Sequence, residues 1–159
     1  LGDYMKKIII ALSVLSAFGA AAPAYAQDFS ASPNYGNATL RTGFTPDPRT
    51  WSIQAGGDID ASRTIGGSCV GYISNSPDLR VNYTAGSLPL IISAVSRADT
   101  TLVVNAPNGR WYCDDDSAGG VNPRVRFNSP QSGSYEIWLG TYSSGGTQQA
   151  TLRVSEIGE

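Results

Sequence analysis

The feature that most constrains this fold is a succession of short runs in which apolar and polar residues alternate. In one run, Leu79, Val81 and Tyr83 alternate with Arg80 and Asn82. The same period of two recurs at residues 51–55, 125–127, 135–139 and 152–155. Alternate side chains of a strand point to the same face, so each run indicates a strand with one covered face. Many short strands between Gly- and Pro-rich turns, without a helical period, predict an all-β antiparallel β-sandwich that is jelly-roll-like.

The strand and turn signals also predict the organisation of the domain. Residues 101–104 and 110–113 flank the turn Ala106-Pro107-Asn108-Gly109, which predicts a hairpin. We expect the sandwich to span residues 45–159. Residues 27–44 are predicted to form a flexible leader with a first short strand near its end.

The N-terminal residues have the pattern of a bacterial secretory signal peptide. Met5-Lys6-Lys7 is basic, residues 8–22 are apolar, and Ala24-Tyr25-Ala26 is a cleavage signal. We therefore predict a signal peptide at residues 5–26, with residues 1–4 upstream of it, and a protein that is exported to the periplasm or beyond. The apolar run is shorter than the roughly 20 residues of a membrane span, so an anchor is the less favoured alternative. No membrane contact is expected after cleavage.

The two cysteines of the chain, Cys69 and Cys113, predict a disulfide in an oxidising compartment. Closing that loop would stabilise the folded chain by roughly 4 kcal/mol in the chain-entropy description. A redox or nucleophilic cysteine pair is the alternative, but neither a C-x-x-C spacing nor a histidine is present to support it.

Composition excludes several kinds of chemistry. The chain has no histidine, which removes Ser-His-Asp and Cys-His mechanisms and histidine-ligated zinc. The two lysines, Lys6 and Lys7, lie in the predicted signal peptide, which removes a Ser-Lys dyad from the rest. The net charge is −2 and no basic stripe is present, so nucleic acid is not expected as a partner. A hydrolase that uses a pair of carboxylates stays open as an alternative, and we expect no enzymatic activity.

An acidic stretch is the strongest candidate for a metal site. Asp114, Asp115 and Asp116 are consecutive and follow a predicted strand beside Cys113. Calcium binds several carboxylate and carbonyl oxygens, and Asp99 and Asn122 could add ligands from the same end of the sandwich. The sequence therefore predicts a calcium site. The equally weighted alternative is a solvated loop whose carboxylates cap backbone amides or pair with arginines.

Aromatic residues offer a candidate binding surface. Trp111 shares a face with Cys113 and is expected to pack on the disulfide, whereas Tyr112 lies on the opposite face. Trp138 lies opposite the apolar residues of its own strand, so Trp138, Tyr142 and Tyr112 are candidates for recognising a glycan or a peptide. For Trp138 the favoured interpretation is that a loop half covers it, because single surface aromatics are normal.

The C-terminal half resembles the bacterial pre-peptidase C-terminal domain. The resemblance rests on D-T-T-L-V-V-N-A-P-N-G at 99–109, S-G-S-Y-E-I-W-L-G-T-Y at 132–142 and A-T-L-R-V-S at 150–155. It implies a jelly-roll-like sandwich that accompanies secreted peptidases without being catalytic. Relatives in that family bind calcium, collagen or other polymers. Similar stand-alone proteins with a W-Y-C-D-D-D-S core carry serine-peptidase names, which the resemblance attributes to association with peptidases.

Together these observations predict a non-catalytic exported module, stabilised by calcium in the acidic loop. Its expected partner is an extracellular polymer or protein. A glycan- or peptide-recognition domain and a hydrolase are the two alternatives, and the oligomeric state stays open.

Overall fold

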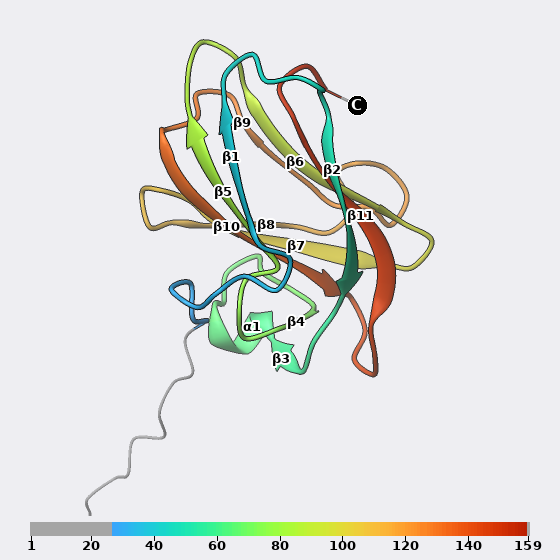
Figure 1. Ribbon diagram of the computed structural model, residues 1–159. Helices are drawn as coiled ribbons and strands as arrows, with labels where there is room; N and C mark the ends of the chain where they lie inside the picture. Colours follow the sequence, from blue (N-terminus) through green and yellow to red (C-terminus); the bar gives the residue numbers. More distant parts are fainter. Residues whose placement is uncertain (1–26, 159) are drawn as a thin grey trace, which may run out of the picture.

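The computed structural model describes residues 27–158, which form a sandwich of two β-sheets (Figure 1). The predicted signal peptide lies outside these residues. The larger sheet contains β1 (Asn37–Arg41), β3 (Ile59–Asp60), β4 (Tyr72–Ile73), β5 (Leu79–Thr84), β7 (Thr100–Asn105), β8 (Trp111–Asp114) and β10 (Gly133–Thr141). The smaller sheet contains β2 (Arg49–Ala55), β6 (Leu90–Ser96), β9 (Arg124–Phe127) and β11 (Gln148–Ser155). The predicted all-β sandwich is thus confirmed.

The alternating runs form strands as predicted. The run at residues 79–83 becomes β5, and its apolar members Leu79, Val81 and Tyr83 are buried. The predicted hairpin is also confirmed, because β7 pairs with β8 and Val103 lies opposite Cys113. Within residues 27–158 one strand pair departs from the antiparallel pattern, since β1 joins β5 in parallel.

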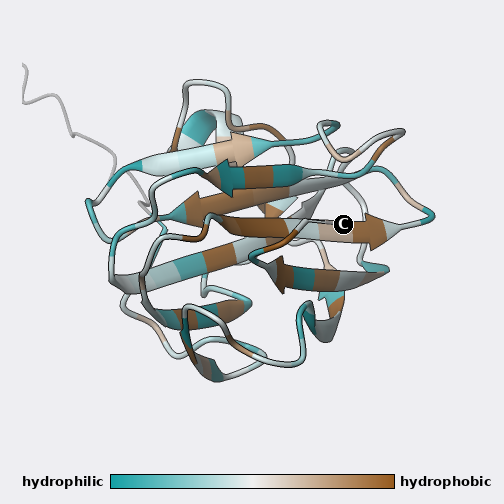
Figure 2. Ribbon diagram, turned by 90° about the horizontal axis from the view of Figure 1, so that it is seen from above, coloured by the Kyte–Doolittle hydropathy of each residue, from teal (hydrophilic) through white to brown (hydrophobic). Residues whose placement is uncertain are grey.

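The main core lies between the two sheets. It is built from the alternate residues of each strand that face inward, and Figure 2 shows brown and teal segments alternating along several strands. On β10 the inward residues are Tyr135, Ile137 and Leu139, which are all buried in this core. The even-numbered residues of β10 therefore lie on the other side of the larger sheet, which we call the outer face.

The outer face is partly covered by residues 57–75, which we call the cover. The cover contains β3, β4 and the short helix α1 (Ala61–Thr64), which lie together at the lower end of the view in Figure 1. A second buried cluster fills the space beneath it and consists of Ala61, Cys69, Ile73, Val103 and Trp138. This cluster explains why β10 is buried on both faces along much of its length.

Glycine lets the cover lie directly on the sheet. A Cβ at Gly140 of β10 would come within 2.8 Å of the Ile73 side chain and 2.5 Å of Thr101 Oγ1. The predicted disulfide joins Cys69 of the cover to Cys113 of β8 and is confirmed. No helix among residues 27–158 is long and apolar enough to cross a bilayer.

The prediction of a flexible leader is wrong for residues 27–36. The backbone amides of Asn34 and Tyr35 donate to the carbonyls of Pro77 and Asp78, at 2.8 and 2.7 Å. The Gln27 side chain is buried and donates to the Ser74 carbonyl at 2.5 Å. Small polar residues and a proline made this stretch look unstructured, but its hydrogen bonds with the chain around β5 hold it against the domain.

Candidate binding groove on the outer face

A row of four side chains crosses the outer face where the cover ends. Glu136 on β10 lies opposite Arg80 on β5 and opposite Asn105 on β7, and Asn105 lies opposite Trp111 on β8. Cross-strand neighbours of this kind have side chains on one face and within reach of one another. The four strands thus place an arginine, a carboxylate, an amide and an indole in one line.

Trp111 marks the boundary between the cover and this row. Its ring centroid is 5.4 Å from that of Trp138, which lies wholly beneath the cover. Trp111 itself is only partly buried, and it packs against the second cluster together with Cys113. The prediction that Trp111 packs beside the disulfide is therefore confirmed, although part of its surface stays open.

Glu136 and Asn105 of this row form the floor of a groove of about 490 Å³, and Trp111 forms part of its wall. Arg80 does not line the groove but is hydrogen-bonded to Glu136. The volume of the groove falls within the usual range of small-molecule sites, about 300–1,000 Å³. Its walls come from the N-terminal segment, the β7–β8 turn and the start of β10. The lining residues include Phe29, Pro107, Trp111, Ser134 and Glu136.

Glu136 is the most constrained polar group in the groove. Glu136 is only 5% exposed. Its Oε1 accepts two hydrogen bonds, from Arg80 Nε at 2.6 Å and from Ser134 Oγ at 2.6 Å. Its Oε2 is buried and has no hydrogen-bond partner among the described residues. A buried carboxylate oxygen without a donor costs free energy, and native structures contain few such atoms.

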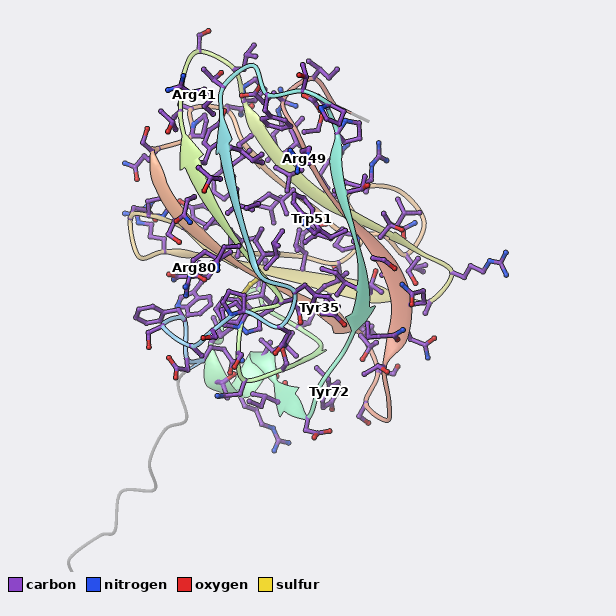
Figure 3. The ribbon with its side chains drawn as sticks, viewed as in Figure 1. Tyr35, Arg41, Arg49, Trp51, Tyr72 and Arg80 are labelled. Atoms are coloured by element: carbon purple, nitrogen blue, oxygen red, sulfur yellow. A yellow bond between two sulfur atoms is a disulfide. The ribbon has the colours of Figure 1, made fainter. Side chains whose placement is uncertain are left out.

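Arg80 links the floor of the groove to one wall. Arg80 Nε donates to Glu136, and Arg80 Nη2 donates to the carbonyls of Phe29 and Ala31, at 3.0 and 3.2 Å. Figure 3 shows Arg80 reaching the N-terminal segment, drawn as the blue end of the ribbon. Phe29 is 54% exposed, so much of its surface is accessible from the groove side.

The prediction that Trp138 forms a binding surface is wrong. Trp138 is fully buried in the second cluster, and its Nε1 donates to the Asn75 carbonyl of the cover at 3.4 Å. Alternation placed the residue on the outer face correctly, but no pattern in the sequence showed that residues 57–75 fold over that face.

The other two candidate aromatics have different environments. Tyr112 is partly buried and packs edge-to-face on Phe127, with ring centroids 4.9 Å apart, so it contributes to the edge of the main core. Tyr142 is 50% exposed, as a surface residue should be. It follows the end of β10, and the groove lining does not include it.

Two of the predicted calcium ligands already have hydrogen-bond donors. Asp114 Oδ2 accepts from the backbone amides of Ser117 at 2.9 Å and Arg124 at 2.8 Å, and its Oδ1 accepts from Ser117 Oγ. Asn122 Oδ1 accepts from the Ser96 amide at 2.9 Å. These contacts are the backbone-capping use that the sequence offered as the alternative to calcium.

The other three predicted calcium ligands, Asp99, Asp115 and Asp116, lie near one another. Burial raises the pKa of Asp99, and the carboxylates of Asp116 and Asp115 raise it further. In the part of the chain that the structure describes, no group of three or more acidic, histidine or cysteine residues could hold a metal ion. The arrangement of these residues gives the calcium site no support, and calcium binding stays a prediction.

Sequence reasoning missed three residues that line the groove, Phe29, Asn105 and Glu136, and it missed Arg80, which binds Glu136. The available signal was Glu136, a carboxylate within the otherwise apolar strand at 135–139. Such a residue needs a partner, and an arginine in a neighbouring alternating run was the natural one. Which of the alternating runs are neighbours depends on the order of the strands in the sheet. That order cannot be inferred from the sequence of short strands.

No family model matches the chain, and no curated protein sequence matches it. Among solved structures, the chain is similar to PliG of Aeromonas hydrophila, a periplasmic inhibitor of g-type lysozyme. The sequence identity is 13% and the TM-score is 0.36, over 75% of this chain and 96% of PliG. The resemblance of the C-terminal half to the pre-peptidase C-terminal domain stays a prediction.

Proposed function

We propose that this chain is an exported, non-catalytic recognition domain and that its ligand-binding site is the groove on the outer face. The ligand presents an apolar face and hydrogen-bond donors. The observation that carries this proposal is the unpartnered Oε2 of Glu136 on the floor of a groove walled by Phe29 and Trp111.

The lining supports binding more than catalysis. Glu136 is the one acidic residue among the groove's lining residues, whereas glycoside hydrolysis uses two carboxylates across the bond that breaks. The lining also has neither histidine nor cysteine. A hydrolase therefore stays the disfavoured alternative.

The rigidity of the floor also favours recognition. Three of the four side chains in the row come from strands that are hydrogen-bonded on both sides, and the disulfide fixes β8 to the cover. A site on strands holds its polar groups in place before the ligand arrives, which lowers the entropy cost of binding.

Co-sedimentation of the exported protein with insoluble extracellular polymers tests this proposal. The panel contains peptidoglycan sacculi, chitin, cellulose and fibrillar collagen. We expect retention on at least one polymer, and we expect Phe29→Ala to reduce it. Tyr142→Ala is the matched control, since Tyr142 is an aromatic residue of similar exposure outside the groove. Retention by none of the polymers, or equal retention of both variants, would contradict the proposal.

A further inference from the structure

We propose that the groove binds a neutral sugar unit of an extracellular polysaccharide, stacked on Trp111 with a hydroxyl donated to Glu136. This inference rests on the proposed function and identifies the class of ligand. It follows from the charge balance of the floor, from the kind of polar atom left free there, and from the shape of the apolar wall.

The charge on the floor is already balanced. Arg80 Nε and Glu136 Oε1 form an ion pair at 2.6 Å, with the two side chains 23% and 7% exposed. A lysine or arginine of a peptide ligand would have to enter beside the Arg80 guanidinium, and like charges at such short range repel. An anionic ligand would meet the Glu136 carboxylate in the same way. A neutral ligand avoids both costs.

Glu136 and Asn105 each have an acceptor oxygen that no described residue donates to. Glu136 Oε2 has no partner. Asn105 Nδ2 donates to the Gly109 carbonyl at 3.3 Å, which leaves Asn105 Oδ1 to accept. Since Glu136 and Asn105 are cross-strand neighbours, a ligand with two adjacent donors would satisfy both atoms. Vicinal hydroxyls of a sugar ring have that property, and a hydrogen bond to a carboxylate is among the stronger kinds.

The wall beside these acceptors is apolar. Trp111 offers a partly open indole, and Phe29 and Pro107 line the same groove. A pyranose ring presents C–H groups on its faces and hydroxyls at its edge, so its face can lie on the indole while its edge reaches the floor. Contact between an apolar face and an aromatic ring adds dispersion and removes apolar area from water.

Calorimetric titration with soluble oligosaccharides tests the inference. The panel contains chito-, cello- and malto-oligosaccharides, and a lysine- and arginine-rich peptide is titrated in parallel. We expect one neutral oligosaccharide to bind and the peptide not to bind. Glu136→Gln replaces an acceptor oxygen by a donor at constant size and should raise Kd about tenfold or more.

Phe29→Ala is the second variant, because Phe29 belongs to neither buried cluster and its truncation should leave the fold intact. It should also weaken oligosaccharide binding, whereas Tyr142→Ala should bind as the unmodified protein does. Binding of the peptide in place of the sugar, weakened by both groove variants, would overturn the sugar inference and leave the groove as the binding site. Sugar binding that neither variant changes would overturn the groove as the site, and with it the proposed function.

Discussion

The rings of Trp111 and Trp138 pack against each other with centroids 5.4 Å apart, one half-open in the groove and the other fully buried beneath the cover. Their planes are tilted by 45°. Trp138 thus supports the indole that lines the groove, and the stability of the second cluster and the geometry of the site depend on the same contact. Several experiments can separate these two roles.

Trp138→Ala should destabilise the domain strongly. A fully buried tryptophan leaves a large cavity when it is truncated, and such changes cost about 3–5 kcal/mol. Urea unfolding followed by circular dichroism measures the loss. Tyr142→Ala is the control and should change the free energy of unfolding by less than about 0.5 kcal/mol, since its side chain is exposed. Similar losses for the two variants would show that Trp138 is not packed as described.

Replacing both Cys69 and Cys113 by serine should lower the free energy of unfolding by about 4 kcal/mol, because the bond closes a loop of 44 residues in sequence separation. Denaturant curves with and without reductant provide the measurement. Reductant should shift the curve of the unmodified protein toward that of the double variant and should leave the double variant unchanged. A double variant as stable as the oxidised protein would contradict this account.

Stability should fall as pH rises from about 4 to about 6, and Asp78 is the cause. Burial raises the pKa of Asp78 from 3.8 to about 6, although hydrogen bonds from the Leu139 amide and the Asn34 side chain oppose the shift. Because the folded-state pKa is the higher one, the folded chain holds a proton that the unfolded chain releases in this range. The stabilisation is complete below pH 4 and is lost as pH passes 6.

The shift of about two pKa units corresponds to roughly 3 kcal/mol. Asp78→Asn removes the titrating group, so the difference in free energy of unfolding between variant and parent should change by about that amount across the range. Chemical denaturation at a series of pH values from 4 to 7 measures it. Parallel pH profiles for the two proteins would show that Asp78 does not titrate in this window.

Calcium and chelator should give the same melting temperature. Asp114 and Asn122 already accept hydrogen bonds from their own surroundings, and an ion would have to displace these donors. Binding to the native state at about a hundred times Kd would add about 2.7 kcal/mol and raise the melting temperature by several degrees. A rise of that size at millimolar calcium would show that the loop rearranges around an ion and would confirm the prediction made from the sequence.

Local patterns were sufficient to predict the sandwich and the disulfide. Alternation at residues 79–83 and the turn at 106–109 each depend on neighbours in sequence, so they could be interpreted without knowledge of the sheet order. The pairing of Cys69 with Cys113 followed because no other cysteine is present.

The groove could not be predicted in the same way, because it depends on contacts between distant segments. The cover over Trp138 and the packing of residues 27–36 against the chain around β5 both join stretches about 40 or more residues apart. Neither has an apolar period, since each is short and rich in glycine, serine and asparagine. The error at Trp138 and the omission of Glu136 have this common origin.

The bond between Cys69 and Cys113 also has a consequence for when the molecule matures. The cover is fastened to β8 by that bond, and β8 carries Trp111 at the edge of the groove. In a reducing environment the chain lacks this disulfide. The cover is then held over Trp138 by packing and hydrogen bonds alone. Formation of this bond is therefore the covalent step that fixes the cover to the strand at the edge of the groove.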